Sequence, residues 1–129
     1  MLKSKTQSWV KIADEDFKVA KDNFKDGHYA HSVYMCHQTI EKYLKALVQE
    51  LTDQIPPFTH NFNILMDASG TPFSQEIEEK ILLLAPHYIP TRYPEELEKM
   101  KEQYTQEATQ NYIKITEEIL IWLKSNYLK

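Results

Sequence analysis

The stretch from residue 28 to residue 51, HYAHSVYMCHQTIEKYLKALVQEL, most constrains what this chain can fold into. Its apolar residues recur at spacings of three and four, which places them on one stripe of an α-helix. They are Tyr29, Val33, Cys36, Ile40, Leu44, Leu47 and Leu51. Such a stripe has to be buried against other elements, so we expect one long helix around which the rest of the chain packs.

A second row of the same stretch is polar. Tyr34, Gln38, Glu41 and Lys45 repeat at the same spacing on another side of the predicted helix. A tyrosine, an amide, an acid and a base in one row are typical of a polar surface that has a function. Glu41 and Lys45 are equally an ordinary i, i+4 pair of a solvated helix. Periodicity alone leaves both interpretations open.

The remainder of the chain is also helical in pattern. With two glycines and few alternating β-branched runs in 129 residues, we expect an all-α protein with a single domain over residues 1–129. The charged segment 95–103 is either a loosely docked helix or a mobile segment. We expect the other helices from Ser8 to a stop at Lys25-Asp26-Gly27, from Thr59 through Met66, from Thr71 or Ser74 to about Ala85, and from about Thr105 to Asn126.

Charge and motif content exclude several classes of protein. A formal charge of −4 gives no global positive field for nucleic acid, and we expect no DNA binding. No glycine-rich phosphate loop and no metal-binding motif occurs, so we expect neither metal nor cofactor. The N-terminus becomes charged where a signal peptide would be apolar, and no run is long enough to span a bilayer. We therefore expect a cytoplasmic protein without membrane association.

Three side chains stand out as candidates for function. Asp16 falls at the edge of an apolar face, which calls for a partner on the second helix or for a catalytic role. His60 would lie in the first turn of a helix capped by Thr59, where the dipole keeps an imidazole neutral for hydrogen bonding or nucleotide contact. Arg92, the only arginine, lies between Pro90 and Pro94 and could clamp a phosphate, or tie its loop to Asp16 or Glu41.

The last predicted helix carries a second apolar row, formed by Ile113, Leu120 and Tyr127. A second row on a terminal helix is often an interface. The simplest interface would be that of a two-fold homodimer.

Several motifs occur in an order that resembles the HEPN family of small prokaryotic helical proteins. They are Trp9, Ala13, Asp16 and Ala20, then Tyr29, the run Cys36-His37-Gln38-Thr39-Ile40-Glu41-Lys42-Tyr43-Leu44-Lys45-Ala46, Thr59-His60, and Arg92-Tyr93-Pro94. The resemblance covers most of the chain. It implies an up-and-down bundle of four to five helices, usually homodimeric and often encoded beside a minimal nucleotidyltransferase. Such pairs behave as toxin and antitoxin or share nucleotide-related work.

Many HEPN proteins are metal-independent RNases in which an arginine is followed four to six residues later by a histidine at the dimer interface. Here no histidine follows Arg92, and the last one, His87, precedes it. We therefore expect a noncatalytic protein that binds a nucleotide or RNA phosphate, with Arg92 gripping phosphate, Lys45 adding charge, and Glu41 with Asp16 orienting the bases. The expected ligand-binding residues are Asp16, Gln38, Glu41, Lys45, His60, Arg92 and Tyr93.

Two alternatives remain open. The first is a weak metal-independent RNase that uses Arg92 with His60 or His87, supported by Tyr93 or Glu41. The second is a dimeric helical adaptor without any ligand, in which the polar row and Arg92 only hold the bundle together.

Overall fold

The computed structural model describes residues 1–87 and 94–129, except for the side chains of Pro94, Glu95, Leu97 and Met100. Within these residues there are six helices and no strand, which confirms the all-α prediction. The count exceeds the expected four to five because the charged segment is itself helical. The helices are α1 (Ser4–Lys25), α2 (Tyr29–Leu51), α3 (Phe62–Ser69), α4 (Gln75–Leu84), α5 (Pro94–Gln103) and α6 (Gln106–Asn126).

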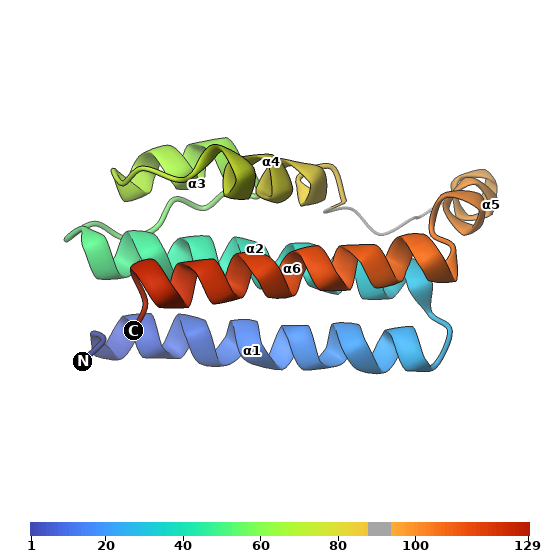
Figure 1. The fold of residues 1–129 in the computed structure, drawn as a ribbon, viewed down its shortest axis with the longest axis horizontal. Coiled ribbons are helices and arrows are strands. Elements are labelled where there is room, and N and C mark those ends of the chain that lie inside the picture. The colour runs from blue at the N-terminus through green and yellow to red at the C-terminus, as the bar shows by residue number, and fades with distance from the viewer. Residues whose placement is uncertain (88–93) are drawn as a thin grey trace.

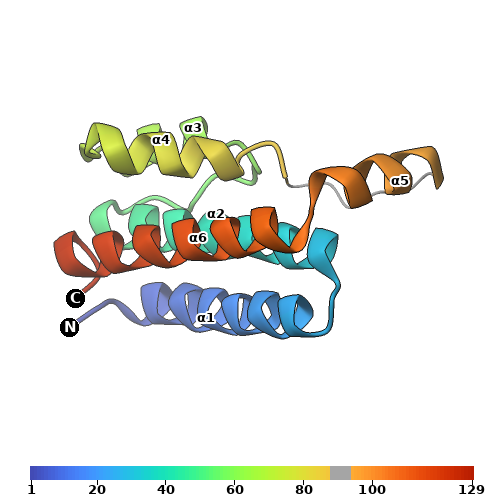
Figure 2. The same cartoon turned by 45° about the vertical axis from the view of Figure 1, so that its right-hand side comes forward.

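Helix α2 lies at the centre of the bundle and contacts each of the other five helices. Helix α1 runs antiparallel to α2 on one side, and the α3–α4 hairpin lies on the opposite side (Figure 1). Helix α6 lies beside α2 and runs in the same direction (Figures 1 and 2). Two faces of α2 are therefore enclosed by different layers, which determines where its polar row can lie.

The predicted apolar stripe of α2 forms the middle of the core. Val33, Cys36, Ile40, Leu44 and Leu47 are fully buried, whereas Tyr29 is half-buried and Leu51 is exposed at the end of the helix. From α1, the core receives Ala13, Phe17 and Ala20, which recur at spacings of four and three. Burial raises the pKa of the Cys36 thiol to about 11, so this cysteine is a small apolar group at neutral pH.

Some helix ends follow the sequence prediction and others do not. Gly27 adopts a left-handed φ of 79° after α1, and the Ser74 hydroxyl accepts a hydrogen bond from the Ile77 N–H at the start of α4. Helix α1 begins at Ser4 rather than after Ser8. Its start is held by the Lys3 N–H, which donates to the Glu50 carboxylate at 2.9 Å, and this tertiary contact adds a turn that local sequence does not predict.

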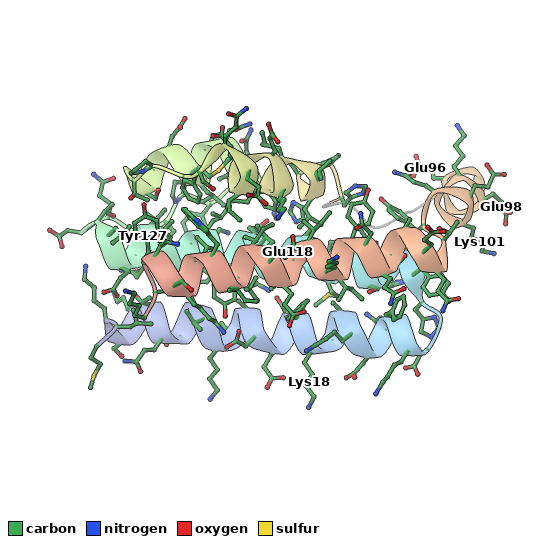
Figure 3. The ribbon with its side chains drawn as sticks, viewed as in Figure 1. Lys18, Glu96, Glu98, Lys101, Glu118 and Tyr127 are labelled. Carbon is green, nitrogen blue, oxygen red and sulfur yellow. The ribbon has the colours of Figure 1, made fainter. Side chains whose placement is uncertain are left out.

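Helix α5 projects beyond one end of the bundle (Figures 1 and 2). Its labelled side chains Glu96, Glu98 and Lys101 lie at that end (Figure 3), and all three residues are exposed. His87 precedes this helix in sequence and Tyr104 follows it, and the His87 ring and the Tyr104 hydroxyl form a hydrogen bond. This side-chain contact therefore holds residues 87 and 104 together.

Residues in the second apolar row of α6 make contacts within the chain. Leu120 is 5% exposed and belongs to the core, and the Tyr127 hydroxyl donates to the Pro72 carbonyl at 2.8 Å. Ile113 is half-buried, and the homodimer interface predicted from this row stays a prediction. No described helix combines the length and apolar character that crossing a bilayer requires.

Candidate functional site

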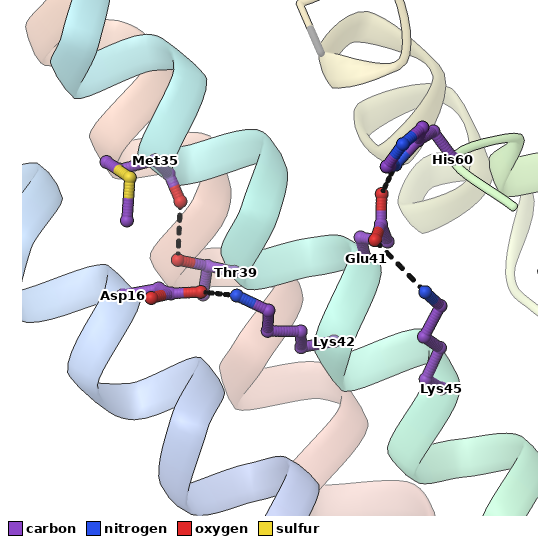
Figure 4. A network of polar contacts seen from close by, with 7 residues as sticks. All are labelled: Asp16, Met35, Thr39, Glu41, Lys42, Lys45 and His60. Atoms are coloured by element: carbon purple, nitrogen blue, oxygen red, sulfur yellow. Dashed lines mark hydrogen bonds and ion pairs between the residues drawn. The ribbon is translucent and has the colours of Figure 1, made fainter. Parts of the chain in front are cut away.

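The polar row of α2 contains a buried carboxylate with two partners. Glu41 is 3% exposed, and its carboxylate lies 3.1 Å from Lys45 Nζ and 2.6 Å from His60 Nδ1 (Figure 4). We refer to Glu41, Lys45 and His60 as the Glu41 cluster. A carboxylate this far from solvent needs such partners, because an unpaired buried charge is strongly destabilising.

The connection between α2 and α3 positions His60 beside this carboxylate. Pro56 and Pro57 restrict the backbone, the Thr59 N–H donates to the Pro57 carbonyl at 3.0 Å, and the Asn61 N–H donates to the Thr59 hydroxyl at 3.0 Å. The side chain of Asn61, not of Thr59, then caps α3 by accepting from the Ile64 N–H. His60 therefore precedes the helix, and the prediction that it lies in the first turn is wrong.

The Glu41 cluster orients an imidazole that ligands can reach. An ionised carboxylate only accepts hydrogen bonds, so Nδ1 of His60 is the donor in this contact and the ring is fixed by it. The His60 side chain is 59% exposed, whereas Lys45 is 12% exposed. Lys45 Nζ also lies 5.7 Å from the centroid of the Trp9 ring, a cation–π contact. The cluster thus combines a buried acid with two basic groups at its outer side.

One buried histidine beside the cluster was not predicted as a site residue. His37 lies one turn before Glu41 on α2, is fully buried, and stacks on Phe62 with 4.3 Å between ring centroids. Burial lowers the pKa of His37 to about 4, against the opposing effect of Glu41, so the ring is neutral at pH 7. The i, i+4 spacing from Glu41 was the only sequence signal that could have found it.

Two clefts flank the Glu41 cluster. The first, about 390 Å³, is lined mostly by polar residues, Thr59, His60, Asn61 and Asn63, together with Phe62 and Ala85. The second, about 380 Å³, is lined by Lys5, Ser8, Trp9, Ile12, Gln49, Ile55 and Pro56. His60 lines the first cleft, and the second is lined by Trp9, which Lys45 contacts. The cluster thus contributes His60 to the first, polar-lined cleft and is linked to the second, apolar cleft only by the contact between Lys45 and Trp9.

The other predicted site residues are placed differently. Asp16 forms an ion pair with Lys42 of α2, which confirms the predicted partner on the second helix (Figure 4). Successive residues of a helix point about 100° apart, so this pair faces α1 while Glu41 faces His60. Gln38 is half-buried on α2, and Arg92 and Tyr93 lie outside the described residues.

His87 lies in an aromatic environment. Its Nδ1 is hydrogen-bonded to the Tyr104 hydroxyl, and its ring lies 4.9 Å from that of Tyr112 between centroids. Burial lowers the pKa of His87 and raises that of Tyr104 to about 12. Both groups are therefore neutral at pH 7 and act as a hydrogen-bonded contact within the bundle. Over residues 1–87 and 94–129, no three His, Cys, Asp or Glu side chains converge as a metal site.

The chain matches the HEPN domain over residues 6–126. It belongs to the HEPN family. This HEPN protein is 32% identical, over 136 residues, to a Methanocaldococcus jannaschii protein named "Putative toxin MJ1304". The match covers 94% of this chain and 86% of that relative.

Two solved structures have the same fold. A crystal structure of TT1696 from Thermus thermophilus superposes with a TM-score of 0.78 at 21% identity, covering 95% of this chain and 98% of that one. A structure of ST0689, described as an archaeal HEPN homologue, gives a TM-score of 0.74 at 24% identity, covering 93% and 95%. At these identities the likeness establishes the helical arrangement alone.

Proposed function

We propose that this HEPN protein binds the phosphate of a nucleotide or of RNA at the Glu41 cluster. The observation that carries the proposal is the buried Glu41 carboxylate, which fixes a Lys45 ammonium and a half-exposed His60 that lines the first cleft. An ion pair that only stabilised the bundle would not require an imidazole held at the rim of a polar cleft.

The groups around the first cleft suit an anionic ligand. The half-exposed His60 imidazole lines this cleft, and Lys45, which contacts the same Glu41 carboxylate, carries three donors, of which one is directed to Glu41. The amides of Asn61 and Asn63 add neutral donors at the same rim. Arg92 is the proposed further phosphate ligand, because its planar guanidinium binds phosphate bidentately.

We further propose that the protein acts as a homodimer in a toxin–antitoxin-like pair with a minimal nucleotidyltransferase in the cytoplasm. The family to which the chain belongs and the toxin name of its Methanocaldococcus jannaschii relative support this role. Co-purification of the protein with the product of a neighbouring nucleotidyltransferase gene would test the pair. Size-exclusion chromatography with light scattering would test the dimer.

Thermal unfolding against a panel of nucleotides and short RNAs tests the binding proposal. A ligand at about a hundredfold over its Kd stabilises the folded state by roughly 2.7 kcal/mol, a readily measured shift. His60→Ala and Arg92→Ala should each abolish the shift. His31→Ala is the matched control, because His31 is an exposed histidine on the first turn of α2. If no nucleotide or RNA shifts the transition, the ligand-free adaptor replaces this proposal.

One observation favours RNA cleavage as a second candidate. A carboxylate bonded to Nδ1 of an exposed histidine, as Glu41 is to His60, is an arrangement used to orient a general base. RNA cleavage that persists in chelator and disappears in His60→Ala would support this candidate. Persistence of cleavage in that variant would exclude His60 as the base.

A further inference from the structure

Phe58 is the most exposed aromatic residue among those the structure describes. Its exposure is 99%, although burying a phenylalanine side chain stabilises a fold. The neighbouring backbone is constrained by Pro56 and Pro57 and by the Thr59 N–H, which donates to the Pro57 carbonyl. The Phe58 ring is therefore exposed to solvent at a position where the backbone has little conformational freedom.

The position of Phe58 relates it to both clefts. Ile55 and Pro56, just before it, line the apolar cleft with Trp9, whereas Thr59 and His60, just after it, line the polar cleft. Two residues of extended chain span at most about 7 Å, so the Cα atoms of Phe58 and His60 lie within the reach of one nucleotide. An exposed aromatic ring and a proposed phosphate-binding group thus come from neighbouring positions of one short segment.

We infer that Phe58 is the stacking platform for an unpaired base, so that the Glu41 cluster takes single-stranded rather than duplex RNA. This inference rests on the function proposed above. A base in a duplex is covered on both faces by its neighbours, and only an unpaired base can place a face on Phe58. The hydrogen-bonding groups next to the ring fit the sugar and phosphate of the same nucleotide.

A protein partner is the competing explanation for exposed apolar side chains, because Ile55 and Ile64 are also 75% and 48% exposed. The polar side chains directly after Phe58 argue against it. Thr59, His60, Asn61 and Asn63 follow Phe58 in the chain and line the first cleft, and His60 is already oriented by a buried acid. A mixed aromatic and polar surface of this kind favours a nucleotide over an apolar helix.

Fluorescence anisotropy with a labelled short RNA, single-stranded or annealed to its complement, tests the inference. The wild-type protein should bind the single strand more tightly than the duplex. Phe58→Ala should weaken single-strand binding about tenfold, the effect of losing one stacked base, and Phe58→Trp should retain it. Ile121→Ala is the matched control, because Ile121 is 59% exposed on α6, and it should leave affinity unchanged.

The outcomes separate this inference from the proposed function. If the wild type binds RNA and Phe58→Ala binds it equally well, the stacking role is overturned while the proposed function stands. Equal affinity for single strand and duplex would likewise overturn it. If the wild type binds neither RNA nor nucleotide, both fall. A change in oligomeric state in Phe58→Ala without a change in affinity would assign the ring to a protein interface instead.

Discussion

Glu41 and His60 are 19 residues apart in sequence, and their side chains are joined by a hydrogen bond of 2.6 Å. The same carboxylate holds Lys45 at 3.1 Å on the adjoining turn of α2. Since Glu41 is 3% exposed, these contacts replace nearly all of its hydration. The pairing therefore links the stability of the bundle to the geometry of the candidate site.

Removing the Glu41 carboxylate should destabilise the protein strongly. Glu41→Ala leaves the poorly exposed Lys45 ammonium without its partner, and we expect a loss of about 2–3 kcal/mol in the free energy of unfolding. Urea denaturation measures this loss. Glu76→Ala is the matched control, because Glu76 forms the same i, i+4 pair with Lys80 but is 77% exposed, and it should change stability by less than about 0.5 kcal/mol. Equal losses in the two variants would contradict the buried role of Glu41.

Asp16 should contribute to stability and not to ligand binding. Its ion pair with Lys42 joins α1 to α2 on a side of α2 that does not face His60. We expect a coupling of about 0.5–1 kcal/mol between the two residues in a double-mutant cycle with Asp16→Asn and Lys42→Met. Affinity for nucleotide or RNA should be the same in Asp16→Asn as in the wild type. A loss of affinity without a loss of stability would instead make Asp16 a ligand residue.

His37 should make the protein less stable in mild acid. Its pKa is about 4 in the folded protein and about 6.5 when unfolded, so the unfolded chain binds the proton first as the pH falls. The stability that the neutral ring contributes is complete above pH 6.5. It is lost progressively between pH 6.5 and pH 4, in total on the order of 3 kcal/mol.

Urea denaturation at several pH values, with His37→Gln for comparison, measures this effect. Glutamine does not titrate, so the variant should lose the part of the pH dependence that His37 causes. The lowered pKa of His87 acts in the same direction, and it is present in both proteins and cancels in the comparison. Identical pH dependence in the two proteins would show that His37 is not the titrating group.

The apolar stripes of the helices could be predicted from the sequence because burial repeats with the helical period. That pattern identified the buried positions from Val33 to Leu47 of α2, and Gly27 and Ser74 marked helix boundaries through local chemistry. The extra first turn of α1 could not be predicted, since it depends on the contact between Lys3 and Glu50. Local signals predict local structure, whereas tertiary contacts need the fold.

The candidate site was only partly predictable for the same reason. The spacing of Glu41 and Lys45 predicts an ion pair, but a helix surface pattern does not tell which polar row lies under a neighbouring layer. The segment from His60 into α3 decides that, because His60 contacts Glu41 and Phe62 stacks on His37. Asp16 and Glu41 were predicted to belong to one site. In the structure, Asp16 of α1 pairs with Lys42, whereas Glu41 contacts His60 of the α2–α3 connection.

The hydrogen bond between His87 and Tyr104 should control how firmly α5 is attached. It joins two residues 17 apart in sequence, one before and one after α5. Helix α5 projects from the bundle and contacts α2. Tyr104→Phe keeps the buried ring and removes the hydroxyl, so we expect a loss of about 1 kcal/mol in stability and faster amide hydrogen exchange in α5. Tyr112→Phe is the control, because Tyr112 packs on His87 by its ring, and it should leave α5 exchange unchanged. Equal acceleration in both variants would mean that the effect is not specific to the hydrogen bond between His87 and Tyr104.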